Sequence, residues 1–243
     1  MSFKKFIIGF DPHGDMQCAK SNKVFFDFIE RWKPDIRIAG GDVWDMRPLR
    51  KKATDDEKRE SMERDFTAGR EWLEKLQPNF FLRGNHDERL WELAESDSGI
   101  RSDYAQKLIC DEVKPLIKSL RCRMLPYHKR QGILKIGHLK VLHGFYCGMY
   151  AAKQHALTYG SCMFGHVHTI EEFSIPGLKR RVGRAGGALC RLDMDYNERQ
   201  PNTLRQANGF PFGVINEKTG SYVAWQAEPI NGHWYIPSDI EEI

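Results

Sequence analysis

Residues 6–14, Phe-Ile-Ile-Gly-Phe-Asp-Pro-His-Gly, carry a short apolar run directly into a polar turn. A run of this length that stops at a charged, glycine-containing turn is typical of a buried strand. The pattern recurs in residues 35–42 (DIRIAGGD) and in residues 79–87 (NFFLRGNHD). The sequence before residue 90 therefore predicts three strands, each of which ends in polar side chains.

A predicted helix lies between each pair of consecutive strands. Apolar residues recur at helical spacing in residues 24–32, and Pro34 ends that helix. The charge-rich stretch from about residue 54 to residue 76 predicts a second helix, which begins at a capping box formed by residues 54–57 and stops at Pro78. Strand–helix–strand alternation with short connections predicts an α/β sheet with helices packed on its faces.

The later part of the chain changes its periodicity. Residues 88–120 are predicted to be helical, with Pro115 as a breaker, and residues 121–142 predict two β segments. Beyond about residue 170 the chain is rich in glycine, proline and aromatic residues, which favours β-hairpins with a turn at residues 216–220.

We expect a single domain over residues 1–243, because 243 residues with 41% hydrophobic and 12% aromatic side chains can fill one large core. Helical inserts are expected at about residues 46–76 and 88–120, and a β-rich C-terminal part at about residues 170–243.

The lengths of the apolar runs, the cysteine spacing and the net charge together exclude several classes of protein. No stretch approaches the roughly 20 apolar residues of a membrane helix. The opening apolar run ends too early, at Asp11, to predict a signal peptide, and no small-residue cleavage site follows. Six cysteines without a CxxC pair predict neither a zinc knuckle nor a disulfide framework. We therefore expect a cytoplasmic protein with reduced thiols, whose net charge of +4 permits an anionic substrate.

Polar clusters with one shared placement suggest a site: each directly follows a strand-like apolar run. The clusters are Asp11-Pro12-His13, Gly41-Asp42, Gly84-Asn85-His86-Asp87, His143-Gly144 and Gly165-His166-Val167-His168. Ligands in open α/β sheets gather beyond the carboxyl ends of strands, so five such clusters can converge. Carboxylate, imidazole and amide oxygen together suit Mn, Fe, Zn, Co or Ni, and the lack of cysteine in the set disfavours a structural zinc site.

Each cluster alone has a structural explanation. Asp-x-His is common as a surface pair, Gly-Asn-His-Asp can be an Asx turn, and His143 can be a half-buried histidine with satisfied hydrogen bonds. His138 and His155 lack the strand-end glycine and are interpreted as surface or structural residues. Cys18 and Cys190 could lie near the predicted pocket, but nothing in the sequence marks either as a nucleophile. The ordered set, rather than any one member, favours a metal site.

The ordered set resembles the calcineurin-like metallophosphoesterase family, whose pattern runs D-x-H, G-D-x-x-D/N, G-N-H-D/E, H and G-H-x-H. The resemblance spans Asp11 to His168. The chain's size and its aromatic, glycine-rich tail are similar to the small stand-alone enzymes of bacteria and phages. The resemblance implies an α/β fold, a β-sheet sandwich flanked by helices, with the metal site at the carboxyl ends of the strands.

The resemblance also implies two ligand sets joined by one bridging carboxylate: Asp11, His13 and His168 for a first metal ion, Asn85, His143 and His166 for a second, and Asp42 for both. His86 would contact the substrate phosphate as general acid or hydrogen-bond donor. Asp45 would support the ligands from behind, and Asp87 would orient His86.

Two divalent ions are expected as cofactors, Mn²⁺ first, with Fe, Zn, Co or Ni as alternatives. At a separation of about 3.5–4 Å they would lower the pKa of a bridging water and neutralise the phosphate oxygens. The substrate expected first is a phosphodiester in DNA, RNA or a nucleotide, and the basic residues 47–52 and 179–184 either bind that polyanion or form solvated loops. A small-molecule phosphomonoesterase, and a non-catalytic metal- or nucleic-acid-binding module, are the alternatives.

Overall fold

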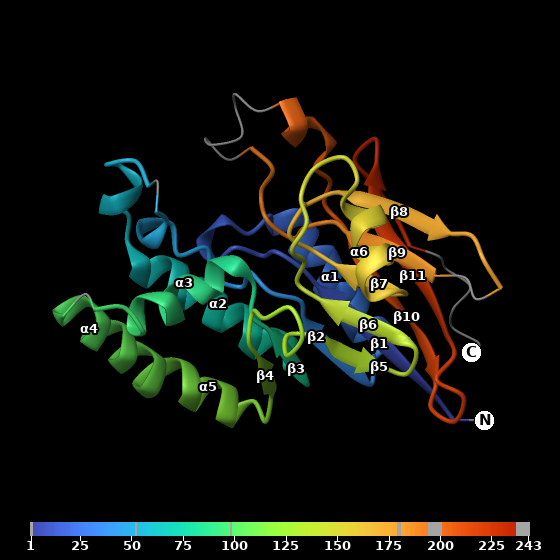
Figure 1. The fold of residues 1–243 in the computed structure, drawn as a ribbon, viewed down its shortest axis with the longest axis horizontal. Coiled ribbons are helices and arrows are strands. Elements are labelled where there is room, and N and C mark those ends of the chain that lie inside the picture. Colours follow the sequence, from blue (N-terminus) through green and yellow to red (C-terminus); the bar gives the residue numbers. More distant parts are fainter. Residues whose placement is uncertain (1, 52, 98, 179–180, 194–200, 237–243) are drawn as a thin grey trace.

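Two β-sheets form the centre of the protein (Figure 1). The structure is a computed structural model that describes residues 2–51, 53–97, 99–178, 181–193 and 201–236. In these residues the larger sheet has seven strands, ordered β12 (His233–Tyr235), β11 (Tyr222–Ile230), β10 (Phe210–Asn216), β1 (Phe3–Gly9), β2 (Ile36–Ala39), β3 (Phe80–Leu82) and β4 (Arg123–Leu125). The smaller has five, ordered β5 (Leu134–Ile136), β6 (Leu139–Leu142), β7 (Cys162–Phe164), β9 (Arg181–Gly186) and β8 (Ile170–Ile175).

Parallel pairing brings the ends of the predicted strands to common edges. Strands β1 to β4 are parallel to their neighbours, with Ile8 opposite Ile38, whereas β10 runs antiparallel to β1, with Val214 opposite Lys5. In the smaller sheet β6, β7 and β9 are parallel. The turns that follow β1, β2 and β3 therefore lie on one edge of the larger sheet, and the turns after β6 and β7 share an edge of the smaller one.

Helices cover the outer faces of the sandwich. The helices are α1 (Ala19–Trp32), α2 (Met62–Leu76), α3 (Asn85–Ala94), α4 (Ile100–Leu108), α5 (Lys114–Ser119) and α6 (Ala151–Tyr159). Strand β1 alternates between two cores, because Phe6 and Ile8 pack in the cluster between the sheets while Ile7 packs in the cluster with α1 and α2. A further apolar cluster joins α6 to the smaller sheet. The expected α/β sandwich flanked by helices is confirmed.

The predicted helix over residues 54–76 begins later than expected. Thr54 and Glu57 do make the reciprocal capping-box hydrogen bonds, 2.6 Å and 3.2 Å long, but these enclose only a 3₁₀ turn at Glu57–Arg59. Helix α2 begins at Met62. The side chains just before it are almost all exposed and offer no apolar face to pack on the sheet, whereas Phe66 is buried.

Pro115 does not break the helical region as predicted. Helix α4 continues through a π-helical turn at Ile109–Val113 directly into α5. Pro115 lies at the start of α5, directly after the π-helical turn. The wider turn before it accommodates the ring without ending the helix.

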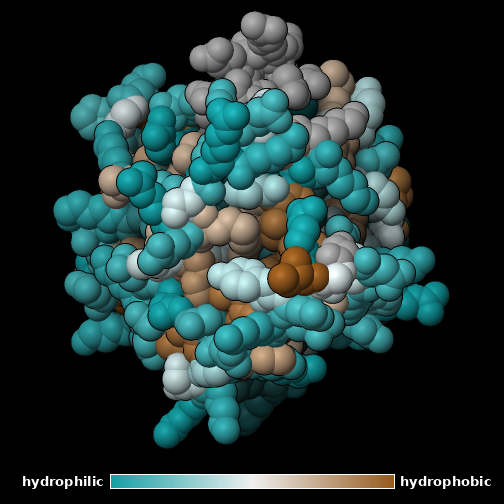
Figure 2. Space-filling view, turned by 90° about the vertical axis from the view of Figure 1, so that its left-hand side faces the viewer, coloured by the Kyte–Doolittle hydropathy of each residue, from teal (hydrophilic) through white to brown (hydrophobic). Residues whose placement is uncertain are grey.

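The outer surface on the α4 side is mainly hydrophilic. Figure 2 shows this side of the protein, with a small group of apolar residues near the middle of a largely polar face. Among the described residues no helix is long and apolar enough to cross a membrane.

Candidate metal centre

The turns that follow β1 and β2 are joined by backbone hydrogen bonds. The N–H of Asp11 donates to the carbonyl of Gly41 (3.1 Å), and the N–H of His13 donates to the carbonyl of Asp42 (3.0 Å). Between the sheets, the N–H of His166 donates to the Asp11 carboxylate at 2.9 Å. The predicted clusters, remote in sequence, therefore meet in one buried region.

One half of the centre contains the predicted first ligand set. Nε2 of His13 lies 3.1 Å from Nε2 of His168, and the latter nitrogen lies 3.6 Å from Oδ1 of Asp11. All three side chains are buried. The donor atoms therefore point at a common volume.

The other half contains the predicted second set. Oδ1 of Asn85 lies 2.7 Å from Nδ1 of His166 and 3.2 Å from Nε2 of His143. His143 is buried, and Asn85 begins helix α3 directly after the turn that follows β3. These three donors again converge.

Asp42 lies between the two halves. Its Oδ2 is 3.2 Å from Nε2 of His143 and 3.9 Å from Nε2 of His13. Asp42 belongs both to a potential metal-binding group with Asp11 and His13 and to one with His143 and His166, each with donor atoms within 4.8 Å of one another. The structure thus brings all seven predicted ligands together. Their coordination roles stay predictions.

The donor set fits divalent cations. Ligands at about 2.1 Å from one ion lie roughly 3.0–3.4 Å from each other, and three of the donor pairs above fall between 3.1 and 3.2 Å. Burial raises the pKa of Asp42, but the charges of His143 and His86 outweigh burial and hold that pKa well below its usual value. Buried carboxylates that stay ionised need cationic partners, which a metal ion supplies.

Half of the ten non-glycine residues with positive φ in the described part of the chain are predicted ligands. Five of the seven predicted ligands have positive φ angles without being glycine: Asp11 (52°), His13 (53°), Asp42 (50°), His166 (68°) and His168 (55°). Such conformations cost about 1–3 kcal/mol each and cluster where function requires a side chain to point in one direction. Lys33 and Gln77 share the conformation as helix C-caps, whereas the five predicted ligands follow strands, so the strain there favours a functional site.

Asp45 is not one of the seven predicted ligands, but its carboxylate positions two imidazole rings of the centre. Its Oδ1 accepts from Nδ1 of His13 (3.0 Å) and from Nδ1 of His86 (2.5 Å), while Nη1 of Arg47 donates to its Oδ2 (2.8 Å). His86 also donates its backbone N–H to Asp42 at 2.8 Å. Its side chain is 18% exposed, more than that of Asp42 or Asp45. His86 thus stands beside the centre on its accessible side.

Asp87 does not orient His86 as predicted. Its carboxylate accepts hydrogen bonds from the N–H of Gly84 (2.8 Å) and of Trp44 (2.9 Å). Burial raises the pKa of Asp87 to about 7. Because helix α3 begins at residue 85, the side chain of Asp87 turns back to its own N-terminus and joins it to the turn after β2. Asp45 takes the position next to His86 instead.

Sequence reasoning missed Asp65 on α2. Its carboxylate accepts from the N–H of Asp45 (2.9 Å) and of Met46 (2.8 Å) and so fixes the loop that carries Asp45. Burial raises the pKa of Asp65 to about 6. A detectable signal was present, because Asp65 stands on the apolar face of its helix beside Phe66, where a charged residue needs a partner.

Two cysteines also contact predicted ligands. Sγ of Cys190 lies 3.8 Å from Nδ1 of His168, and Sγ of Cys147 lies 3.1 Å from Nε2 of His166. Nothing in their sequence spacing indicates these contacts. By contrast, His155 is structural as predicted, since its buried ring accepts from the N–H of Phe145 at 3.0 Å.

The basic segments are less free than the sequence suggested. Arg47 is paired with Asp15, Asp45 and Glu60. Arg50 is paired with Glu57 and Arg184 with Glu172, whereas Lys179 and Arg180 lie outside the described residues. Carboxylates thus already neutralise three of the predicted polyanion-binding side chains.

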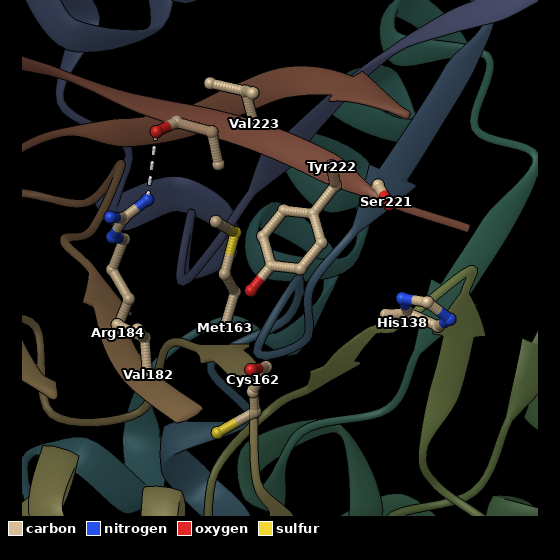
Figure 3. Close-up of a pocket in the computed structure, with 10 residues that line it drawn as sticks. His138, Cys162, Met163, Val182, Arg184, Ser221, Tyr222 and Val223 are labelled. Atoms are coloured by element: carbon tan, nitrogen blue, oxygen red, sulfur yellow. Dashed lines mark hydrogen bonds between the residues drawn. The ribbon is translucent and has the colours of Figure 1, made fainter. Parts of the chain in front are cut away.

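A separate cavity of about 450 Å³ opens between the sheets (Figure 3). Arg184 and Met163 line it from the smaller sheet, and Tyr222 and Val223 from β11. Arg184 donates there to the carbonyl of Ala224 at 3.1 Å. The lining includes none of the seven predicted ligands.

No family model matches the chain, and no curated protein matches it. Among solved structures, it is similar to Vacuolar Protein Sorting 29 from Cryptosporidium parvum, with 10% identity over 96% of this chain and 95% of that one and a TM-score of 0.47. It is also similar to YfcE, a phosphoesterase from E. coli, with 14% identity over 91% and 97% and a TM-score of 0.41. These likenesses are too remote to assign a family. What the chain does possess is a buried carboxylate–imidazole centre whose donors are spaced for divalent metal ions.

Proposed function

We propose that this protein hydrolyses phosphate esters with two divalent metal ions, as the resemblance to calcineurin-like metallophosphoesterases of the small stand-alone type implies. One observation carries the proposal. Asp42 is shared by two groups of buried donors, one with Asp11 and His13 and the other with His143 and His166. A single carboxylate between two donor groups is the arrangement that a pair of ions requires.

The residues have separate tasks in this proposal. Two ions, with Mn²⁺ expected first, would polarise the phosphoryl oxygens and supply a water of lowered pKa. Asp42 holds the two donor groups at a fixed separation, and its backbone carbonyl and carboxylate keep His13 and His86 in place. The buried walls exclude bulk water from the donor side, which strengthens each charge interaction.

We assign to His86 the task of stabilising the oxygen of the leaving group. Burial lowers the pKa of His86, so its ring is neutral at pH 7. With Nδ1 donating to Asp45, Nε2 is left to meet the substrate on the accessible side. Because Nδ1 keeps its hydrogen for Asp45, Nε2 carries a hydrogen only in the protonated ring, so His86 would act on the departing oxygen as an imidazolium that donates from Nε2.

The substrate that we favour is a phosphodiester in a nucleotide or nucleic acid. Arg47 and Arg184 are already paired with carboxylates, so they are not available to bind a run of phosphates. A nucleotide requires fewer basic side chains for binding than a long nucleic acid does, and it therefore suits this surface better. A small-molecule phosphomonoester is the alternative, and a chain of 243 residues forming one domain suits either.

The test compares diester with monoester. Metal-stripped protein is reloaded with Mn²⁺ and incubated with bis-p-nitrophenyl phosphate and, separately, with p-nitrophenyl phosphate. We expect diester turnover, and we expect Asp42→Asn to lose bound Mn²⁺ and turnover together, while Asp27→Asn, changed at the exposed Lys23–Asp27 ion pair, keeps both.

The other outcomes separate the alternatives. Turnover of the monoester alone would assign the protein to the phosphomonoesterases. Metal-loaded protein that turns over neither ester, nor any nucleotide or nucleic acid offered, would identify a non-catalytic binding module and refute the proposed hydrolysis.

A further inference from the structure

The histidines of the centre share one feature at their second ring nitrogen. Nδ1 of His143 donates to the carbonyl of Gly40 at 3.1 Å, and Nδ1 of His13 donates to the Asp45 carboxylate at 3.0 Å. In both rings Nδ1 therefore keeps a hydrogen, and Nε2, which faces the other donors, offers its lone pair once a metal ion displaces the proton there. A partner of this kind fixes the tautomer and orientation of a metal-binding imidazole.

His168 has the same orientation but a different partner. Its Nε2 faces Asp11 and His13, and its Nδ1 faces Sγ of Cys190 at 3.8 Å. His168 is 7% exposed and Cys190 is 0% exposed, so water does not compete for the contact. The sulfur thus occupies the position that a carboxylate and a carbonyl occupy behind the other two rings.

The backbone around Cys190 holds the sulfur in place relative to the centre. Leu189 donates its N–H to the carbonyl of Phe10 (3.0 Å) and accepts from the N–H of Cys18 (2.9 Å), and the N–H of Arg191 donates to Met16 (2.8 Å). These hydrogen bonds join the segment around Cys190 to the stretch that carries Asp11 and His13. They fix the backbone position from which the Cys190 side chain reaches His168.

We propose that Cys190 is the positioning residue of His168, because its sulfur accepts the Nδ1 hydrogen and leaves the Nε2 lone pair to the metal ion held with Asp11 and His13. This inference rests on the proposed metal centre and assigns one task within it. Sulfur is a weaker acceptor than carboxylate or carbonyl oxygen. The metal affinity of the Asp11–His13–His168 half consequently depends on this buried thiol, whereas the thiol beside His166 in the other half, that of Cys147, is exposed.

The test measures metal binding rather than turnover. Metal-stripped wild type, Cys190→Ala, Cys190→Ser and Cys162→Ala are titrated with Mn²⁺ by calorimetry. Cys162 is the matched control, because it is equally buried and lies on β7 with no contact to a predicted ligand. Thermal unfolding of the metal-free variants shows whether the two alanine variants lose similar stability.

We expect Cys190→Ala to weaken one of two binding steps by about 10–100-fold and to leave the other step unchanged. Cys190→Ser should restore most of that loss, since its hydroxyl can accept the same hydrogen, and Cys162→Ala should bind like wild type. A cavity effect alone would make the two alanine variants alike.

Two results would overturn the inference while the metal centre survives. The first is Cys190→Ala with both steps equal to wild type. The second is a sulfur-to-cobalt charge-transfer band in the Co²⁺-loaded wild type that Cys190→Ala lacks, because it would make the sulfur a ligand itself. Wild type that binds no ion at all would instead overturn the proposed function on which the inference rests.

Discussion

Raising the pH should destabilise the metal-free protein, because two buried histidines of the centre are charged at neutral pH. Burial lowers the pKa of His13, but its hydrogen bond to Asp45 and the charge of that carboxylate outweigh burial and raise the pKa to about 9. Burial likewise lowers the pKa of His143, and the charge of Asp42 raises it to about 9. Without metal, these two imidazolium ions are the partners of the buried carboxylates.

The magnitude follows from the difference between folded and unfolded chains. An unfolded histidine titrates near 6.5 and these two near 9, so each contributes about 3 kcal/mol of folding free energy. Because the folded pKa is the higher one, this contribution is complete below pH 6.5. It is lost as the pH rises from 6.5 through 9.

Denaturant unfolding measures the effect directly. Chelator-treated protein is unfolded in urea at half-unit steps from pH 6.5 to 9.5, and the free energy of unfolding should fall by several kcal/mol across the range. His143→Gln should reduce the slope by about half. A flat or rising profile in the wild type would refute the assignment of charge to His13 and His143.

Metal binding should reverse this dependence. A ligating imidazole must be neutral, so at pH 7 an entering pair of ions displaces the protons of His13 and His143. We expect about two protons to be released, read from calorimetry in two buffers of different ionisation heat. The metal-loaded protein should accordingly gain stability over the same pH range in which the metal-free protein loses it.

Three substitutions give further predictions. Gly84→Ala would place a Cβ 2.0 Å from Oδ1 of Asp42, so we expect a loss of about 1–3 kcal/mol in thermal unfolding together with loss of bound metal. Gly99→Ala, which is strained by a φ of 58° but places its Cβ within 4 Å of no other atom, should lose stability and keep its metal. Asp65→Ala leaves the buried N–H groups of Asp45 and Met46 without their acceptor and should cost about 2–3 kcal/mol in urea unfolding, with wild-type stability as the contrary result. His86→Ala should retain both ions by elemental analysis and slow ester hydrolysis about 10²–10⁴-fold, and an unchanged rate would remove His86 from the mechanism.

Local patterns in the sequence predicted most of the sheet architecture. The apolar runs before Asp11, Asp42 and Asn85 are strands, and the turn at residues 216–220 connects β10 to β11. These features depend on periodicity and on turn residues, which neighbouring positions encode. The order of the polar clusters then predicted which side chains would meet, and the geometry brings those side chains together.

Contacts between distant segments were harder to predict. The start of α2 depends on which side chains the sheet can bury, and the partner of Asp87 depends on the direction that α3 takes from its first residue. Asp65 and Cys190 act on residues 20 and 22 positions away in sequence, respectively, through a backbone N–H and a ring nitrogen. No spacing rule specifies such partners, because they follow from how the layers pack.

Anomalous diffraction from crystals grown with Mn²⁺ would locate the metal ions. We expect two peaks about 3.5–4 Å apart on either side of Asp42, one among Asp11, His13 and His168 and the other among Asn85, His143 and His166. A difference map with no peak at these donors, or with a single ion that leaves one donor group without metal, would contradict the proposed pair of metal ions.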